Sequence, residues 1–344
     1  MKNLLVVYHS PCMDGFGAAC AFNDQVDKSE WDTITYYPCG YGQLVELKYM
    51  VGNNPLSGKT HVLCLDICPT PETLDFMLVD RGLNVAILDH HDTAMDNLEE
   101  YTKTGILFTV TEDYSGASLV KALGKSVNRV FNQDMGEAVY LESEGILTNN
   151  DIHKYLDSSL ITDSPLFTLL EVRDLWIRTD AALKQQADDM AAYFKKNDIS
   201  KGPLIPMAEF EALVPIALKE GRVINAELEI IVNEAIAKSV TWDQEADGEK
   251  LSILVGEVPQ ELGSLFGSVY NDSCDCNSLA VGTYSEGGLV QGLSLRSKGD
   301  TGYARIVAET FGGGGHNHAS GANFKAKPLT QEQLIDRVKQ ALQS

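Results

Sequence analysis

The 344-residue chain has few basic residues for its number of acidic ones. It carries 49 Asp and Glu against 27 Lys and Arg, a formal net charge of −22. Binding to long duplex DNA is dominated by neutralisation of phosphates with Lys and Arg, so this balance argues against a protein that follows long DNA. It does not exclude small phosphorylated substrates, because a bound divalent metal inverts the local field of an acidic site.

Long hydrophobic runs are also missing. Runs such as residues 4–7 (LLVV) have the length of a strand and fall far short of the roughly 20 residues that span a bilayer, so we expect no membrane segment. The N-terminus lacks the apolar stretch and small-residue cleavage site of a signal peptide. Seven Cys at irregular spacing suit a reducing compartment better than a disulfide framework. Together these features predict a cytoplasmic protein.

What the chain does contain is enough apolar residues for two domains. Hydrophobic residues make up 44% of the sequence, which is sufficient to bury a core without disulfides or structural metals. In the first half, residues 4–7, 62–65 and 85–88 have the pattern of strands, and residues 71–80 that of a crossover helix with Thr70 as its N-cap. This βαβ rhythm predicts a doubly wound parallel sheet.

The second half predicts a smaller α/β domain. Helical spacing at 181–196 and 223–238, with Gly202-Pro203 as a break between them, indicates a helical connection. Strand-like runs at 251–255, 278–284 and 289–295 and a helix at 303–311 follow. We therefore divide the chain into a first domain (1–190), a helical connector (191–222) and a second domain (223–344).

Three of the predicted strands run directly into residues that bind metals. His9 and Asp14 follow the first strand, Asp66 follows the second, and residues 89–91 (DHH) follow the third. Strands of a parallel sheet present their carboxyl ends at one edge, where ligands bind. An isolated Asp at a strand end is usually a turn or cap residue, but the combination favours a metal site. Carboxylates and imidazoles with few thiolates suit Mn²⁺, Mg²⁺, Fe²⁺ or Zn²⁺.

The same segments carry a resemblance to a known family. Residues 85–91 (VAILDHH) resemble the signature strand and triplet of the DHH phosphoesterase superfamily. Residues 9–19 (HSPCMDGFGAA) resemble its first motif and residues 63–66 (LCLD) its second. The resemblance implies that His9 ligates a first ion, that Asp66 bridges two ions, and that Asp14 and His90 hold the second. It further implies that Asp89 orients its neighbours and that His91 lies near the scissile phosphate.

Two positions leave alternatives open. Cys12 stands where the first motif commonly has an Asp; a thiolate binds Zn²⁺ or Fe²⁺ but is a poorer partner for Mn²⁺ or Mg²⁺, so the centre holds one ion or two. Otherwise Cys12 is a small buried residue. For the family's fourth motif we prefer Asp174 in residues 171–176 (EVRDLW). This segment resembles the fourth motif of a branch whose first motif, like this one, carries a Cys followed by Asp-Gly-Phe. The alternative is Asp163 in LITDSP, otherwise a turn or cap residue before a proline.

A second group of signals lies near the C-terminus, in residues 311–321 (FGGGGHNHASG). Consecutive glycines let backbone N–H groups converge on an anion. The segment resembles the signature of the DHH-associated C-terminal domain, and residues 293–297 (LSLRS) resemble that domain's arginine strand, whose planar guanidinium suits phosphate. The resemblance implies a substrate-binding domain and an active site in the cleft between the domains. The implied substrate-binding residues are Arg296, Gly313, Gly314, Gly315, His316 and Ser320.

This pair of domains is similar to the branch that includes RecJ-like exonucleases, nanoRNases and cyclic-dinucleotide phosphodiesterases. The resemblance implies a phosphodiesterase, with Mn²⁺ as the expected metal, that cleaves short RNA or linear dinucleotides such as pGpG to 5′-mononucleotides. Short substrates fit the charge, because the chain lacks the basic groove that follows a long strand. A 3′-phosphoadenosine 5′-phosphate phosphatase, a cyclic-dinucleotide phosphodiesterase and a non-catalytic nucleotide receptor are the alternatives. Because family members often dimerise, a homodimer is also expected.

Overall fold

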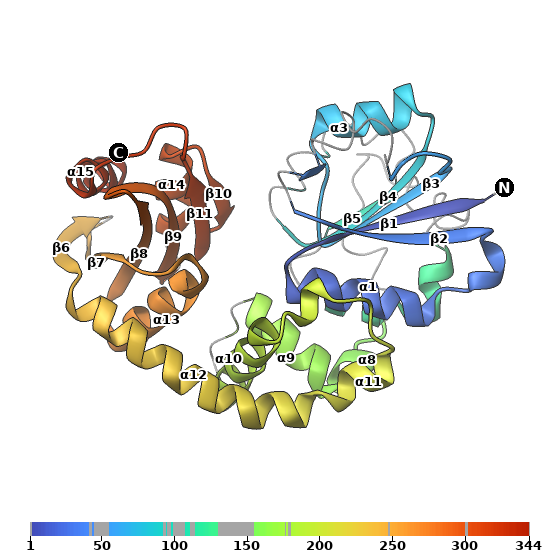
Figure 1. Cartoon of the computed structure of the whole chain (residues 1–344), viewed down its shortest axis with the longest axis horizontal. Helices are drawn as coiled ribbons and strands as arrows, with labels where there is room; N and C mark the ends of the chain where they lie inside the picture. The colour runs from blue at the N-terminus through green and yellow to red at the C-terminus, as the bar shows by residue number, and fades with distance from the viewer. Residues whose placement is uncertain are drawn as a thin grey trace. The chain divides into compact units, whose positions relative to one another are not determined.

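The computed structural model describes residues 2–40, 43–44, 55–91, 94, 98, 107–110, 114–129, 155–175, 177, 180–246, 248–299 and 302–343. These residues form two compact units, Met1–Ile224 and Asn225–Ser344. Among the residues so described, no helix combines the length and hydrophobicity needed to cross a bilayer. Figure 1 shows each unit as a sheet with helices packed on it.

The first unit is built on a five-stranded parallel sheet. Its strands are β1 (Asn3–His9), β2 (Thr33–Cys39), β3 (His61–Leu65), β4 (Asn84–Asp89) and β5 (Leu107–Val110), in the order β2-β1-β3-β4-β5. This confirms the predicted parallel sheet. The order reverses between β1 and β3, and such a switch point is where open α/β sheets bind their ligands.

Alternating side chains of the strands supply two separate cores. Leu4, Val6, Leu63 and Leu88 face α1 (Met13–Gln25), α5 (Gly116–Leu123) and α9 (Pro165–Asp174). On the opposite face, Leu5, Val7, Val62 and Ile87 contact α3 (Pro71–Asp75) and the π-helical turn η2 (Phe76–Asp80). Because both faces are covered, the strands are continuous hydrophobic runs.

The predicted crossover helix at 71–80 differs from the structure in its second half. It is α-helical only to Asp75 and continues as the π-turn η2. Thr70 occupies the N-cap position, but its side chain makes no capping hydrogen bond; its hydroxyl lies 3.1 Å from the hydroxyl of Thr73 instead.

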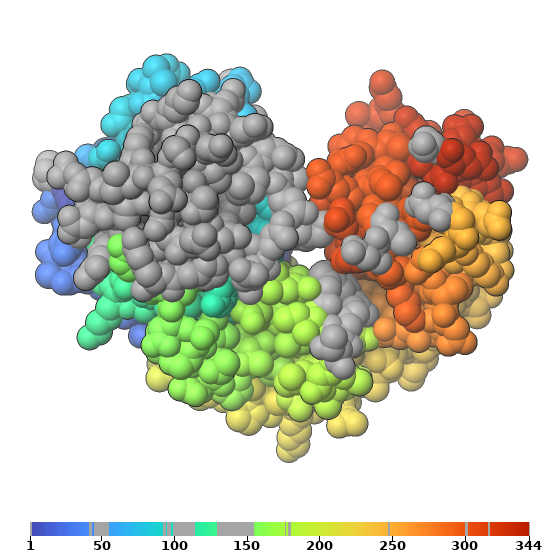
Figure 2. Space-filling view, turned by 180° about the vertical axis from the view of Figure 1, so that it is seen from behind, coloured from blue at the N-terminus to red at the C-terminus, as the bar shows by residue number. Residues whose placement is uncertain are grey.

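Further helices and helical turns complete the first unit and lead into the second. They are η1 (Lys28–Glu30), η4 (Gly124–Arg129), α8 (Ser159–Thr162), α10 (Ala181–Lys196), η5 (Ile199–Lys201), α11 (Met207–Ala212) and α12 (Val214–Ala237). The Gly202-Pro203 pair separates η5 from α11, as its sequence predicts. Residues 155–175 and 180–196, green in Figure 2, form part of the surface of the first unit.

The second unit contains a six-stranded, mostly antiparallel sheet in the order β10-β11-β9-β8-β7-β6. The strands are β6 (Val240–Ala246), β7 (Glu249–Glu257), β8 (Asn277–Glu286), β9 (Leu289–Lys298), β10 (Gly314–His316) and β11 (Ala319–Asn323). Among the described strands of this sheet, β7 and β8 alone pair in parallel. α14 (Tyr303–Thr310) and α15 (Gln331–Ala341) pack on one face, and η6 (Gln260–Leu262) and α13 (Gly263–Ser273) on the other. The predicted smaller α/β domain is thereby confirmed.

Candidate metal centre

The chemistry of the first unit gathers at the carboxyl ends of β1, β3 and β4. His9 is the last residue of β1, Asp66 follows β3, and Asp89 ends β4. Since the three strands are parallel neighbours, their ends meet at one edge, beside the switch point between β1 and β3. The structure thus brings together the strand-end residues that the sequence singles out.

Asp66 lies at the centre of the cluster. Its backbone is left-handed, with φ of 57°, a conformation that Asp tolerates better than most residues. Its two carboxylate oxygens face different histidines: Oδ1 is 3.2 Å from His90 Nε2, and Oδ2 is 3.4 Å from His9 Nδ1. The side chain is 1% exposed. This one buried carboxylate therefore lies close to two imidazoles, those of His90 and His9.

His90 lies close to Asp66 and to two further carboxylates. Its Nε2 lies 2.9 Å from Asp174 Oδ2 and 3.9 Å from Asp14 Oδ2. Asp174 reaches the cluster from the last turn of α9. The competing residue, Asp163, is exposed at the C-cap of α8 and is not in this cluster.

Asp89 holds the third strand end and orients the residues after it. Its Oδ1 accepts hydrogen bonds from the backbone N–H groups of His90 at 2.8 Å and His91 at 3.3 Å. The same oxygen lies 2.7 Å from His91 Nδ1. Burial opposes protonation of His91, but the charge and hydrogen bond of Asp89 raise its pKa. The fully buried Asp89 therefore fixes the ring orientation of His91.

The donor atoms form three overlapping groups, each with atoms within 4.8 Å of one another. The first group is His9, Cys12 and Asp66; the second is Asp14, His90 and Asp174; the third is Asp66, Asp89, His90 and His91. Asp66 and His90 each belong to two groups. Such a mixture of carboxylates and imidazoles suits hard and borderline divalent cations.

The electrostatics of the cluster fit a cation. No hydrogen bond satisfies the buried oxygens Asp14 Oδ2, Asp66 Oδ1, Asp66 Oδ2 and Asp174 Oδ2, although imidazole nitrogens of His9 and His90 lie 2.9 to 3.9 Å from them. Donor oxygens of Asp14 and Asp174 lie within 4.8 Å of each other, and buried carboxylates this close repel one another unless a positive charge lies between them. The residues present therefore fit a divalent metal.

The pKa values of these groups follow the crowding of charge. Burial and the carboxylates of Asp174 and Asp66 raise the pKa of Asp14 well above its usual range. Burial acts the same way on Asp66, but contacts with His9 and His90 outweigh it and lower its pKa. For His90, burial is opposed by Asp174 and Asp66, and the pKa is raised. The raised pKa values of Asp14 and His90 are in the direction that crowded negative charge produces.

Cys12 is placed beside the first group of donors. It is the N-cap residue of α1, and its side chain makes no capping hydrogen bond. Burial and the charges of Asp66, Asp174 and Asp14 raise the pKa of its thiol well above the ordinary value. Its sulfur lies within 4.8 Å of donor atoms of His9 and Asp66, so the geometry permits ligation.

Two residues that the sequence motifs miss complete the surroundings of Asp14. Ser115, fully buried at the N-cap of α5, donates a hydrogen bond from Oγ to Asp14 Oδ1 at 2.6 Å, and the Ala117 N–H donates to the same oxygen at 3.1 Å. A Cβ at Gly116 would lie 2.7 Å from Asp66 Cβ and 2.9 Å from Asp14 Oδ2. The sequence signal is a Ser before a helical apolar pattern, which indicates a cap but not its contact with a carboxylate.

The predicted substrate-binding residues of the second unit do not gather on one face of its sheet. Arg296 lies on β9 opposite Ala319 of β11, and its stem packs against Gly267 of α13, where an added Cβ would come within 2.5 Å. Ser320 pairs with Leu295, whose side chain belongs to the core under α14. Because side chains alternate along a strand, Arg296 and Ser320 lie on opposite faces of the sheet.

Part of the glycine segment forms a strand, which the sequence analysis did not predict. Gly314 and Gly315 belong to β10, which pairs with β11. A Cβ at Gly313 would lie 2.1 Å from the carbonyl oxygen of Gly321, whereas one at Gly314 would meet no atom within 4 Å. The backbone of His316 pairs with Ala319, but its side chain falls outside the described part of the structure.

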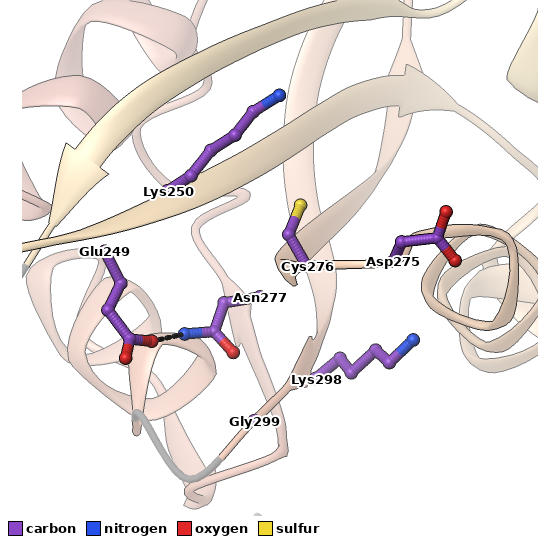
Figure 3. Close-up of a pocket in the computed structure, with 7 residues that line it drawn as sticks. All are labelled: Glu249, Lys250, Asp275, Cys276, Asn277, Lys298 and Gly299. Atoms are coloured by element: carbon purple, nitrogen blue, oxygen red, sulfur yellow. Dashed lines mark hydrogen bonds between the residues drawn. The ribbon is translucent and has the colours of Figure 1, made fainter.

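A cavity of about 590 Å³ opens on the second unit (Figure 3). It lies at the start of β7 and β8 and the end of β9, and its lining comprises Glu249, Lys250, Asp275, Cys276, Asn277, Lys298 and Gly299. Glu249 Oε2 accepts a 2.6 Å hydrogen bond from Asn277, and Lys250 is paired with Asp243 at 2.9 Å. This lining does not include any of the predicted substrate-binding residues.

Comparison with known proteins finds the fold in solved structures. No protein-family model matches the sequence, and no curated protein matches it. RecJ from Thermus thermophilus in complex with Mn²⁺ superposes with a TM-score of 0.54 at 15% identity, over 99% of this chain and 51% of that one. Exonuclease RecJ bound to manganese gives 0.50 at 14%, over 99% and 89%. An exopolyphosphatase-related protein from Bacteroides fragilis gives 0.48 at 15%, over 99% and 92%.

The similarity to RecJ confirms the fold that the DHH resemblance implies. It extends over both units of the chain, the parallel sheet and the smaller mixed sheet. At these identities the similarity concerns the fold, and the activity has to be argued from the cluster itself.

Proposed function

We propose that the protein is a metal-dependent phosphoesterase of the DHH superfamily that hydrolyses short oligoribonucleotides or linear dinucleotides such as pGpG to 5′-mononucleotides. The observation that carries the proposal is Asp66, whose two buried oxygens each face a separate group of donors. Asp66 would thus be available to two divalent ions, and a pair of ions would stabilise both the attacking and the leaving oxygen of a phosphoryl transfer.

The residues that would hold the metals follow from the donor groups. His9 and Asp66, with Cys12 beside them, would hold one ion, and Asp14, Asp66, His90 and Asp174 a second. Divalent ions held there would supply Lewis-acid activation of water and stabilisation of negative charge at phosphorus. We expect Mn²⁺, because both similar RecJ structures are complexes with manganese.

Asp89 and His91 would act on the phosphate. Because Asp89 Oδ1 engages Nδ1 of His91, the other ring nitrogen is the one available to a substrate oxygen. We assign His91 the role of stabilising or protonating the phosphate oxygen, and Asp89 the role of fixing the ring for that contact.

In the second unit, Arg296 would bind the terminal phosphate of the substrate. A guanidinium offers two parallel donors to phosphate, and the contact of its stem with α13 limits its rotamers. The glycine segment with His316 would form the other part of the substrate site. The net charge of −22 disfavours long polyanions through repulsion, which is why we propose short substrates.

The test is a substrate panel with purified protein and Mn²⁺. It contains labelled pGpG, RNA of two to ten nucleotides, cyclic dinucleotides and 3′-phosphoadenosine 5′-phosphate. We expect the fastest turnover on two- to five-nucleotide RNA and pGpG. Preference for 3′-phosphoadenosine 5′-phosphate or a cyclic dinucleotide would replace the proposed substrate while keeping the metal centre, and no product from any compound would refute the enzyme and favour a receptor.

A matched pair of variants ties turnover to the cluster. His90→Ala removes a member of two donor groups and should abolish turnover. Asp163→Asn changes an exposed acid at the end of α8 and should leave turnover unchanged. Metal analysis of Cys12→Asp beside the wild type tests the group formed by His9, Cys12 and Asp66. A change in the metal bound per chain would show that Cys12 is a ligand, and an unchanged metal content would show that it is not.

A further inference from the structure

Two further polar side chains lie on the face of the second sheet that carries Arg296. They are Tyr284 of β8 and Ser294 of β9, and like Arg296 they are partly buried. Tyr284 pairs in register with Gly292 of β9, and positions two apart on a strand share a face. The three side chains therefore belong to the same face of the sheet, the one that packs on α13.

Contacts among these side chains connect them into one group. Arg296 Nη1 donates hydrogen bonds to Ser294 Oγ at 3.4 Å and to the carbonyl oxygen of Leu295 at 2.7 Å. Burial raises the pKa of the Tyr284 phenol, and this outweighs the nearby charge of Arg296 and a hydrogen bond with Ser294, which act in the opposite direction. The phenol therefore keeps its proton at neutral pH and can donate a hydrogen bond.

Close packing holds the ring of Tyr284 in place. A Cβ added to Gly292 would lie 2.8 Å from Tyr284 Cε2, so the ring lies against the backbone of β9. A Cβ added to Gly263, the first residue of α13, would lie 3.8 Å from Cε1 of the same ring and 2.7 Å from Ser294 Cβ. The side chain is thus held between β9 and the start of α13. A donor fixed in this way loses little conformational entropy when it binds a ligand.

We propose that Tyr284 is a specificity-determining residue that binds the same terminal phosphate as Arg296, with its hydroxyl as a neutral hydrogen-bond donor beside the guanidinium. The inference rests on the proposed function, in which Arg296 binds that phosphate, and it names the group that selects a phosphorylated end of the substrate over a hydroxyl end. A site built to hydrogen-bond a phosphate discriminates against an analogue that lacks it, because its polar groups then lose their partner.

The test is equilibrium titration of the full chain with pGpG and with GpG, which lacks the terminal 5′-phosphate. EDTA is present, so that metal-dependent turnover does not consume the ligands. The wild type should bind pGpG about tenfold more tightly than GpG, or better. Tyr284→Phe keeps the ring and its packing, and should weaken the binding of pGpG about tenfold while leaving that of GpG unchanged.

Tyr270→Phe is the matched control. It also removes a hydroxyl from the second unit, but that hydroxyl lies 2.9 Å from Ser252 Oγ on β7, so the variant should keep the wild-type ratio of the two affinities. A loss of the ratio in both variants would mean that removing any buried hydroxyl disturbs the site, and would overturn the assignment to Tyr284.

A double variant tests whether Tyr284 and Arg296 bind one phosphate. If they do, Tyr284→Phe combined with Arg296→Lys should lose less affinity for pGpG than the product of the two single losses. A wild type that binds pGpG and GpG alike, a Tyr284→Phe protein that keeps the wild-type ratio, or a double loss that reaches the product would overturn the proposal. Because turnover is not measured, a protein that binds pGpG in this way but does not hydrolyse it with Mn²⁺ would refute the proposed function alone.

Discussion

The two units place their predicted functional residues in different ways. In the first unit, residues distant in sequence converge. His9 and His90 both lie within ion-pair distance of the Asp66 carboxylate. In the second, Arg296 and Ser320 lie near each other in the sheet but on opposite faces. The ends of neighbouring parallel strands meet at one edge, so a parallel sheet gathers the side chains that follow its strands. Successive residues along a strand alternate between faces, and Ser320 pairs with Leu295, the residue before Arg296. Sequence proximity is therefore a poor guide to a shared site in the second unit.

The largest expected effect comes from the residue that joins the donor groups. Asp66→Asn keeps the size of the side chain and tolerates the positive φ, but removes the shared negative charge. Loss of an outer contact to a metal ligand typically costs 10- to 100-fold, so loss of this carboxylate should lower turnover by more than about 100-fold and weaken all Mn²⁺ binding. Turnover and isothermal titration with Mn²⁺ measure both. Asp174→Asn should leave the group formed by His9, Cys12 and Asp66 able to bind Mn²⁺. If Asp66→Asn and Asp174→Asn lose equal amounts of Mn²⁺ binding, Asp66 is not shared by two donor groups.

Removing a helix cap should have different consequences in the two units. Ser115→Ala removes the cap of α5 and the 2.6 Å hydrogen bond to Asp14, so we expect Mn²⁺ affinity to fall about 10- to 100-fold. Thr330→Ala removes the capping box of α15 and should cost about 1 kcal/mol of stability without a change in Mn²⁺ affinity. Titration with Mn²⁺ and denaturation curves for both proteins make the comparison. Unchanged affinity in Ser115→Ala would mean that Asp14 does not need this hydrogen bond.

These contacts show what the sequence could and could not reveal. The strands that lead to His9, Asp66 and Asp89 were predictable because these apolar runs are too short for a typical helix, and the parallel arrangement followed from the helix predicted between them. The contact of Ser115 was not, because a cap signal says nothing about which distant carboxylate the hydroxyl meets, here 101 residues away in the chain. The strand β10 was missed because consecutive glycines carry no pattern of alternation, so only pairing with β11 defines it.

Two glycines of the second unit separate an effect on packing from an effect on substrate binding. Gly313→Ala places a Cβ 2.1 Å from the Gly321 carbonyl oxygen, and overpacking of this kind costs about 1–3 kcal/mol. Gly314→Ala meets no atom within 4 Å and should change stability by less than about 0.5 kcal/mol. Urea denaturation measures the difference. If Gly314→Ala raises KM while stability is unchanged, the backbone there contacts substrate; if both variants are equally stable, β10 does not pair with β11 in this register.

The smallest effects should decide which face of the second sheet meets the substrate. Arg296→Lys keeps the charge but loses the planar pair of donors, and we expect KM to rise about tenfold with little change in kcat, because a terminal phosphate contact contributes equally to ground-state and transition-state binding. Ser320→Ala should change KM by less than about twofold, since Ser320 lies on the face of the core under α14 and is 6% exposed. Steady-state kinetics on pGpG measure both. The opposite ranking would place the substrate on the α14 face and remove Arg296 from the site, whereas two equal and large effects would contradict the assignment of the substrate to one face of the sheet.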